Sequence, residues 1–242
     1  MIIETIILLV LLTLLASTIG TIAGFGLSVI MVPILLFFFP LPTVLLFVGI
    51  LHLFNSIWKI KFFAKGINWK IILPFGGFGV IGSFIGANLV LELPEELIVR
   101  ILGVALLCYA LFLFYRGGLN IPKNYGTLSA GGLFSGFAAG LFGIGGPIRG
   151  AVASSYNLKK YTYFATLGVA GLLIDVVRLS SYFSQEIELL PILMLSLVFC
   201  IPMSFTGTLW ARNIIDKISN HHINKLVALF LFASAIKFII FP

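Results

Sequence analysis

The feature that most constrains this chain is a series of apolar segments, each about as long as a lipid bilayer is thick. A helix needs about 20 such residues to cross about 30 Å of hydrocarbon, whereas the strands of a membrane barrel give alternating segments of about ten residues. Unbroken segments cover residues 42–63, 69–90, 95–116, 161–183, 189–210 and 222–241. The sequence therefore predicts an all-α fold, that of a polytopic helical membrane protein.

The composition agrees with a protein whose main solvent is lipid. Hydrophobic residues make up 60% of the chain and charged residues 10%, against about half and about a quarter in soluble domains. The formal net charge of +7 lies in short loops between the apolar segments, so no soluble basic face is left to bind nucleic acid. These loop charges are expected to set the orientation of the chain in the membrane.

Two further apolar segments are interrupted by glycines. Residues 2–19 are followed by the break "GTIAGFG" at 20–26 and a short apolar piece at 27–39. Residues 126–141 are followed by the break "FGIGG" at 142–146 and a second short piece. A piece of about 13 residues is only about 20 Å long as a helix and does not span the bilayer alone. Each break therefore predicts a re-entrant hairpin or a long helix paired with a half-helix.

The same order of elements occurs twice, which indicates an internal duplication. Shifting the second half back by 119 positions places Gly143 on Gly24 and Arg178 on Lys59. Each half has three spanning segments besides its broken one, and this odd number inverts one half relative to the other in the membrane. We expect two membrane repeats in one integral membrane domain, at residues 1–120 and 121–242.

The loop charges predict which ends of the segments face the cytoplasm. Short cytoplasmic loops are rich in lysine and arginine, so the acidic loops at 92–96 and 184–188 are expected outside. Arg100 and Lys237 run against this orientation, although long side chains can extend to the interface. The residues expected inside are Lys59, Lys61, Lys65, Lys70, Arg116, Lys123, Lys159, Lys160, Arg212, Lys217 and Lys225. We therefore predict a multi-pass integral membrane protein of the plasma membrane.

Charged residues also occur inside two predicted spans. Such residues are costly in lipid and usually functional, with a partner nearby. Asp175 lies three residues before Arg178, on the same helical face, and is either half of a structural ion pair or a carboxylate that couples transport to protons. His52 and Asn55 face the same way as Lys59, so they are expected to add polar groups to a cavity. His52 itself is either a packing residue or a proton carrier.

The breaks have the properties of an anion site. Irregular backbone is tolerated in a membrane only where it is buried in protein or lines a cavity. A half-helix that starts after a break points free N–H groups and its positive dipole end into the gap. The expected donors are the amides around Gly26, Leu27 and Ser28 and those of Gly145, Gly146 and Ile148, since Pro147 has no N–H. Arg149 lies within one turn of the second break and could hold the anion with two hydrogen bonds. The alternatives are close helix packing for the glycines and an interfacial position for Arg149.

The glycine-spaced stretches resemble a known family. "GTIAGFGLSVIMVP" and "GLFSGFAAGLFGIGGPI" each open one half of the chain and resemble the signature of the sulfite exporter TauE/SafE family. The resemblance extends over nearly the whole chain and includes "NWK" after residue 67. Where that family usually has a run of glycines, this chain has Leu27 and Ser28 in the first copy. The resemblance implies a transporter of small sulfur-containing anions, such as sulfite and sulfonates.

We therefore expect a secondary transporter that exports a small organosulfur or sulfur oxyanion by alternating access. The chain has no P-loop, no HExxH motif and no hydrolase elbow, so we expect no enzyme activity, no metal and no cofactor. The alternatives are an importer or channel-like pathway for the same anions, and a non-transporting membrane scaffold. The expected partners are the anion and the lipid bilayer, with no nucleic acid. A coupling proton and a homodimer are left open.

The expected substrate site combines both breaks with the polar residues of the spans. Asp175 is the candidate for proton coupling. The substrate-binding candidates are Gly24, Phe25, Gly26, Leu27, Ser28, His52, Asn55, Lys59, Gly143, Ile144, Gly145, Gly146, Arg149 and Arg178.

Overall fold

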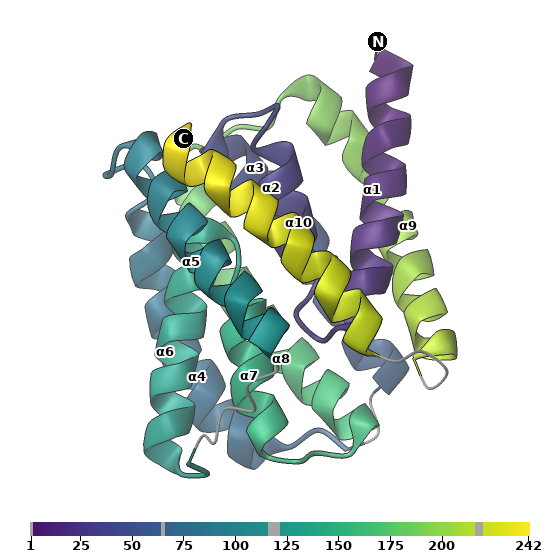
Figure 1. Ribbon diagram of the computed structural model, residues 1–242, viewed down its shortest axis with the longest axis vertical. Helices are drawn as coiled ribbons and strands as arrows, with labels where there is room; N and C mark the ends of the chain where they lie inside the picture. The colour runs from purple at the N-terminus through teal and green to yellow at the C-terminus, as the bar shows by residue number, and fades with distance from the viewer. Residues whose placement is uncertain (1, 64–65, 116–121, 216–219) are drawn as a thin grey trace.

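A computed structural model describes residues 2–63, 66–115, 122–215 and 220–242. These residues form helices and no strand, which confirms the all-α prediction. Helices α1, α3, α4, α5, α8 and α9 are long and apolar enough to cross a membrane. The helices, drawn in Figure 1, are α1 (Ile2–Ile22), α2 (Ser28–Leu35), α3 (Leu41–Phe63), α4 (Trp69–Asn88), α5 (Glu95–Tyr115), α6 (Tyr125–Phe142), α7 (Gly146–Ser155), α8 (Lys160–Ser184), α9 (Pro191–Ile214) and α10 (Asn220–Ile240).

Each half of the chain opens with a broken helix, as the glycine breaks predict. After α1 the chain turns through residues 23–27 into α2, and after α6 it turns through 143–145 into α7. Helices α2 and α7 have only 8 and 10 residues, too few to cross the bilayer. In Figure 1, α1 runs downward from the N-terminus while α6 runs upward, so the two broken helices point in opposite directions.

The helix contacts follow the order of the repeat. Helix α4 packs against α6 in the same way as α9 packs against α1, and α3 packs against α8 and α5 against α10. Exchanging the halves turns the α4–α6 contact into the α9–α1 contact and leaves the α3–α8 and α5–α10 contacts unchanged. Figure 1 shows α5 and α10 side by side across the front of the molecule. The division of the chain at residues 120 and 121 stays a prediction, because both residues lie outside the described ranges.

Small residues bring α4 and α6 into close contact. A Cβ added at Gly132, Gly136 or Gly140 of α6 would overlap backbone atoms of α4. Such contacts let two membrane helices approach closely and pack their backbones together. These three glycines of the second glycine-rich stretch therefore serve helix packing.

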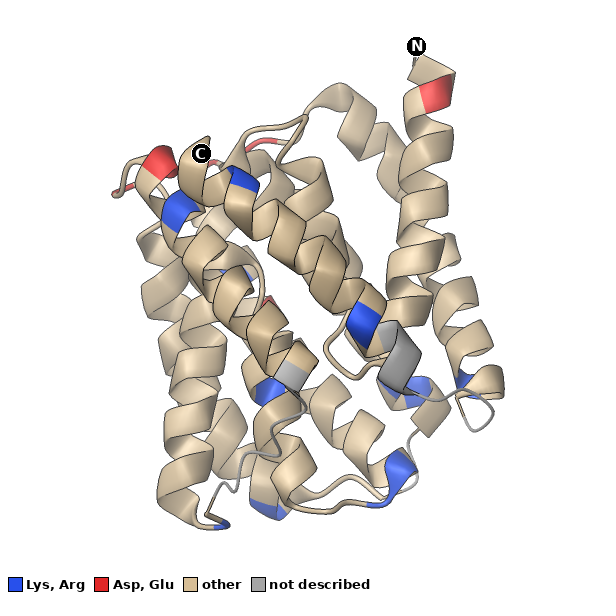
Figure 2. Cartoon of the chain, in the orientation of Figure 1, with Lys and Arg blue, Asp and Glu red and all other residues tan. Residues whose placement is uncertain are grey.

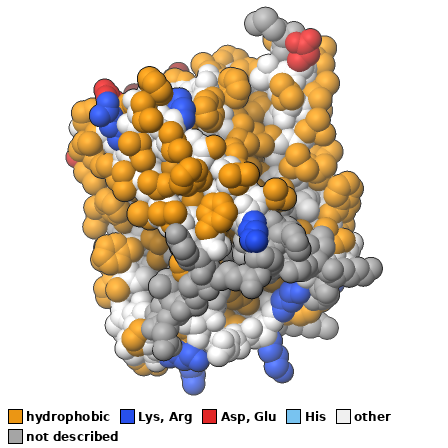
Figure 3. Space-filling view, in the orientation of Figure 1, with side chains coloured by type: hydrophobic (Ala, Val, Ile, Leu, Met, Phe, Trp, Pro, Cys, Tyr) orange, Lys and Arg blue, Asp and Glu red, His pale blue; other side chains and the backbone are white. Residues whose placement is uncertain are grey.

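The charges divide between the two ends of the molecule. Figure 2 shows the carboxylates gathered mainly at the end that holds both termini, and most lysines and arginines at the other end. On the face in Figure 3, hydrophobic side chains cover most of the described surface between these ends. Of the expected inward-facing residues, Lys65, Arg116 and Lys217 lie outside the described residues.

The two cations that run against the charge rule have local partners at the acidic end. Arg100 Nη2 lies 2.6 Å from Glu96 Oε1 on the exposed surface of α5. Lys237 Nζ lies 5.3 Å from the ring centre of Phe37 and 5.2 Å from that of Phe238. Contacts of this kind stabilise a cation at an apolar surface. Both exceptions are thus compatible with the predicted orientation.

Candidate functional site

Both breaks depend on glycine for their backbone shape. Gly24 and Gly26 in the first break have φ angles of 85° and 87°, and Gly143 in the second has 73°. These left-handed values are favourable only for glycine. The tight turns already use some of the amides, because Gly26 N–H donates to the Gly20 carbonyl at 2.8 Å and Gly143 N–H to the Ala139 carbonyl at 3.0 Å. These two amides are therefore not free to bind a ligand.

The first turns of the two short helices offer other amides. In the described chain no acceptor is found for the backbone N–H of Leu27 or Ser28, at the start of α2. The same holds for Gly145 and Gly146, at the start of α7. Pro147 follows in the first turn of α7, where its missing N–H costs no helical hydrogen bond. Both helix starts have the donors expected of an anion site.

The two breaks touch each other inside the molecule. A Cβ at Gly146 would overlap the carbonyl group of Phe25, so the backbones are already in contact there. The carbonyl oxygen of Gly24 lies 3.4 Å from the position of a Cβ at Gly150. The sequence repeat predicts this meeting of the breaks, and the structure shows it.

A buried polar network joins α3 to α8 beside the breaks. Asp175 Oδ2 lies 2.6 Å from His52 Nδ1, and Asp175 Oδ1 lies 2.7 Å from Arg178 Nη2. Ser56 Oγ donates to the same Oδ2 at 3.3 Å. A carboxylate only accepts hydrogen bonds, so Nδ1 of His52 carries a proton in this contact. The opposite ring atom, Nε2, faces the first break, 2.7 Å from where a Cβ on Gly26 would lie.

Arg178 also fixes the second break. Its Nη1 donates to the carbonyl oxygens of Ala139 and Gly143, at 3.3 and 3.4 Å. These carbonyls close the C-terminal end of α6, where a positive charge is favourable. The hydroxyl of Tyr182 donates to the Gly140 carbonyl nearby. Arg178 is thus engaged with Asp175 on one side and with the end of α6 on the other.

A small polar cavity lies between the first break, α3, α7 and α8. Its volume is about 10 Å³, which is about the room that one water needs. Arg149 and Lys59 are 5% and 6% exposed, and neither has an ion-pair partner among the described residues. The residues that line the cavity are Gly24, Phe25, Gly26, His52, Ser56, Lys59, Arg149 and Leu167.

Glycines of α8 make room for the two cations of the cavity. A Cβ at Gly171 would overlap Nη1 of Arg149, and one at Gly168 would lie 3.2 Å from Cβ of Lys59. Nη1 of Arg149 is buried and has no hydrogen-bond partner in the described structure. The fold therefore buries the guanidinium group of Arg149 and leaves its Nη1 without an acceptor in the described structure.

The remaining expected residues do not line this cavity. Leu27 and Ser28 begin α2, and residues 143–146 form the second break, on the far side of the Phe25 carbonyl. Asn55 instead faces α9, where its Nδ2 donates to Thr208 Oγ1 at 2.7 Å. Asp175 and Arg178 belong to the network behind His52. Within the described residues, no group of three histidine, cysteine or acidic side chains is placed to hold a metal ion.

A second, wider pocket, called the vestibule below, borders the cavity region and has Lys160 in its wall. Its volume is about 460 Å³, and it shares Gly24 with the cavity. The loop between α7 and α8, with Asn157 and Leu158, forms part of its wall together with Lys160. Tyr163 lines it as well, and its hydroxyl lies 2.9 Å from where a Cβ on Gly24 would lie. The vestibule therefore lies next to the cavity and includes Lys160, which the charges predict to be at the cytoplasmic end.

Sequence reasoning missed two residues at this site, Ser56 and Tyr163. Ser56 is an isolated hydroxyl inside an apolar span, and only the crossing of α3 with α8 brings it to Asp175. In the sequence, Tyr163 is one of several aromatic residues near helix ends, so nothing indicates that it belongs to a site. The one usable signal for Ser56 is its position, one turn beyond His52 on the same face.

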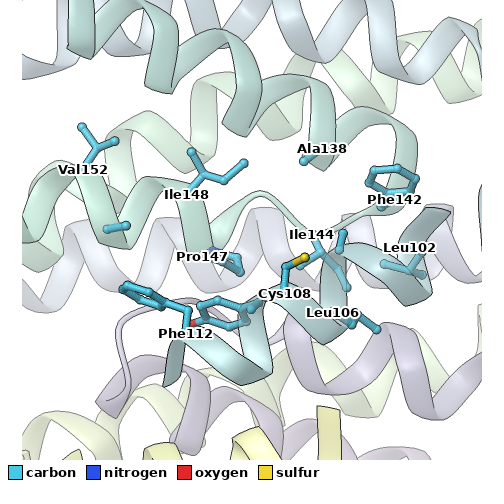
Figure 4. Close-up of a pocket in the computed structure, with 13 residues that line it drawn as sticks. Leu102, Leu106, Cys108, Phe112, Ala138, Phe142, Ile144, Pro147, Ile148 and Val152 are labelled. Carbon is cyan, nitrogen blue, oxygen red and sulfur yellow. The ribbon is translucent and has the colours of Figure 1, made fainter. Parts of the chain in front are cut away.

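An apolar pocket of about 490 Å³ lies on the other side of the second break (Figure 4). Its walls come from α5, α6 and α7, with Ile144 of the break among them. Tyr109 of α5 lines it and packs edge to face against Phe25, with ring centres 6.0 Å apart. The equivalent helices of the other half are in contact, since α10 packs on α2. The two halves therefore differ in conformation at this place.

Comparison with known proteins identifies one relationship. The family model described as sulfite exporter TauE/SafE matches residues 9–238, which is nearly the whole chain. No curated protein and no solved structure matches the chain.

Proposed function

Since this chain belongs to the sulfite exporter TauE/SafE family, a family of membrane transporters of sulfur compounds, we propose that it exports a small sulfur oxyanion across the plasma membrane. The anion is of the sulfite or sulfonate type. The chain is a multi-pass integral membrane protein, and it works as a secondary transporter by alternating access. It uses no cofactor and performs no chemical conversion of the anion.

The observation that carries this proposal is the buried cavity lined by Arg149 and Lys59. A charge that is buried in a low-dielectric interior without a partner destabilises the folded protein by roughly several kcal/mol. Neither cation has an ion-pair partner in the described chain, and Nη1 of Arg149 has no hydrogen bond at all. The cavity has room for about one water in this state, so we propose that it widens to admit the larger oxyanion. The bound oxyanion then removes this cost, because it accepts hydrogen bonds from both groups.

The helix starts next to the cavity support the same ligand class. The free amides of Leu27 and Ser28 begin α2, and those of Gly145 and Gly146 begin α7. Oxyanions are bound at such places by the amides and by the positive end of the helix dipole together. The breaks in the two halves thus supply backbone donors, and α3 and α7 supply the charges.

The difference between the halves supports alternating access. Toward the acidic end the cavity is closed by buried side chains of α3, with Leu45, Val48 and Leu51 all 0% exposed. Toward the basic end lies the vestibule, so the described state faces the cytoplasm under the positive-inside rule. In the exchanged state, α5 would close on α7 and α10 would separate from α2. The apolar pocket of Figure 4 gives α7 the room for this movement.

Proteoliposomes that contain purified protein and internal sulfite test the proposal. We expect saturable sulfite efflux and also counterflow, in which unlabelled anion outside accelerates the exit of labelled anion. Protein-free vesicles and vesicles with Arg149→Ala are the controls. Flux without saturation or counterflow would indicate a channel, inward transport alone would indicate an importer, and no flux at all would indicate a scaffold. Each of these three results contradicts the proposed exporter.

A further inference from the structure

The charges around the cavity do not balance. Asp175 is the one carboxylate that contacts this region in the described structure, and its Oδ1 is paired with Arg178 at 2.7 Å. Its other oxygen is taken by His52 and Ser56. Asp175 is thus engaged by Arg178, His52 and Ser56, and the two basic residues Lys59 and Arg149 have no ion-pair partner among the described residues.

The two unbalanced cations face the same small space from different helices. Lys59 comes from α3 and Arg149 from α7, and both line the cavity next to Gly24. Both are more than nine-tenths buried. The cavity has room for about one water in this state, so an oxyanion needs it to widen. An anion held between the two side chains would then interact strongly with each charge, because little water screens them.

We infer that the cavity selects a doubly charged oxyanion, and that Lys59 is the residue that sets this preference. The inference rests on the proposed function and makes its substrate class narrower. A dianion neutralises both cations, whereas a monoanion leaves one of them buried without a partner, which is the costly state. Arg149 has the planar fork that grips two oxygens, and Lys59 adds a second, compact charge that needs no fixed geometry.

The geometry assigns the preference to Lys59 because the other cations have additional roles. Arg178 holds the end of α6 and pairs with Asp175, so removing it changes the fold around the second break. Arg149 supplies directional hydrogen bonds that any oxyanion uses. Lys59 has no hydrogen bond in the described chain, so its replacement changes the charge of the cavity and disturbs little else.

Sulfate and methanesulfonate form the matched pair of probes. Both are tetrahedral at sulfur and similar in size, but methanesulfonate has a methyl group in place of one oxygen and carries one negative charge instead of two. We expect the purified protein to bind sulfate at least about tenfold more tightly than methanesulfonate, as measured by calorimetry. In Lys59→Met this ratio should fall below about threefold, mainly through weaker sulfate binding. Lys59→Arg keeps the charge and should keep the preference.

Lys61→Met is the control, because Lys61 lies on the same helix but is exposed and faces the Phe205 ring. This variant should bind both anions as the parent does. Equal affinity of the parent for the two anions would overturn the inference and leave the proposed function standing. A parent that binds neither sulfate, sulfite nor methanesulfonate would overturn the proposed function itself. If Lys59→Met does not fold, Lys59→Gln takes its place, because it also removes the charge; an unchanged ratio of the two affinities in that variant would overturn the assignment to Lys59.

Discussion

The carbonyl oxygen of Phe25 lies directly against Gly146, so the backbones of the two helix breaks are in contact although they belong to opposite halves of the chain. Only a residue without a side chain fits at position 146. The cavity beside this contact is lined by Gly24, Phe25 and Gly26 of the first break and by Arg149 of α7. The proposed site therefore draws on both halves of the chain.

Replacing Gly146 by alanine tests the contact between the breaks. The added Cβ would overlap the Phe25 carbonyl group, a backbone atom that cannot rotate away. We expect a loss of about 1–3 kcal/mol in stability, the usual cost of overpacking a tight interior. Thermal unfolding in detergent measures it. Gly77→Ala is the matched control, since nothing lies within 4 Å of a Cβ there; equal melting temperatures for the two variants would contradict the contact.

The glycines that correspond in the repeat should behave differently when a side chain is added. At Gly26 the φ of 87° strains any other residue, and the new Cβ would crowd His52 Nε2 inside the cavity. At Gly145 the Cβ would meet the backbone of Ser135 on α6, outside the cavity. We expect Gly26→Ala to weaken sulfite binding in folded protein, and Gly145→Ala to lower the melting temperature first. Calorimetry and thermal unfolding of both variants check this expectation. Weaker binding only in Gly145→Ala, with a lower melting temperature only in Gly26→Ala, would contradict it.

Replacing the two arginines of the site by alanine should have different effects. Arg149→Ala removes a charge-assisted contact with the anion, worth about 1.5–3 kcal/mol, and should reduce affinity about ten- to hundredfold in stable protein. Arg178→Ala leaves Asp175 buried without its cation, which costs about 3–5 kcal/mol and should deplete folded protein. Size-exclusion profiles and anion titrations on both variants check this. If the Arg178→Ala variant is stable but no longer binds the anion, Arg178 and not Arg149 contacts the anion.

Filling the apolar pocket should stop transport and leave binding intact. Ala151 of α7 lines this pocket, and phenylalanine there occupies the space into which α7 would move. We expect Ala151→Phe to bind sulfite as the parent does but to show little counterflow in proteoliposomes. Ala130→Phe, at an exposed position of α6, is the control for added bulk. Full counterflow by Ala151→Phe would show that closure of α5 on α7 is not part of the cycle.

Much of the fold follows from the sequence because the membrane makes few structures possible. Segment length and the glycine breaks predict the helices, and the odd number of spans in each half predicts the inversion. Even so, the repeat does not make corresponding residues equivalent. Lys59 and Arg178 match in register, yet Arg178 is paired with Asp175 while Lys59 faces the cavity without a partner. No local sequence pattern distinguishes these two roles.

The composition of the site could be predicted only in part, for a physical reason. The breaks and the charged residues are visible because glycines and charges are unusual inside an apolar span. Ser56 and Tyr163 are ordinary residues whose neighbours come from other helices, so their contacts depend on how α3, α7 and α8 cross. The same crossings turn Asn55 toward Thr208 and not toward the cavity.

The most direct test of the account is to locate a bound anion. Selenate has the shape and charge of sulfate, and its selenium gives an anomalous signal in a crystal of the full chain. We expect a single selenium peak between Arg149 and Lys59, beside Gly24, placed so that the selenate oxygens accept hydrogen bonds from both side chains. A selenium peak elsewhere in the protein, or an empty cavity in crystals of protein that binds selenate in solution, would contradict the assignment of this cavity as the anion site.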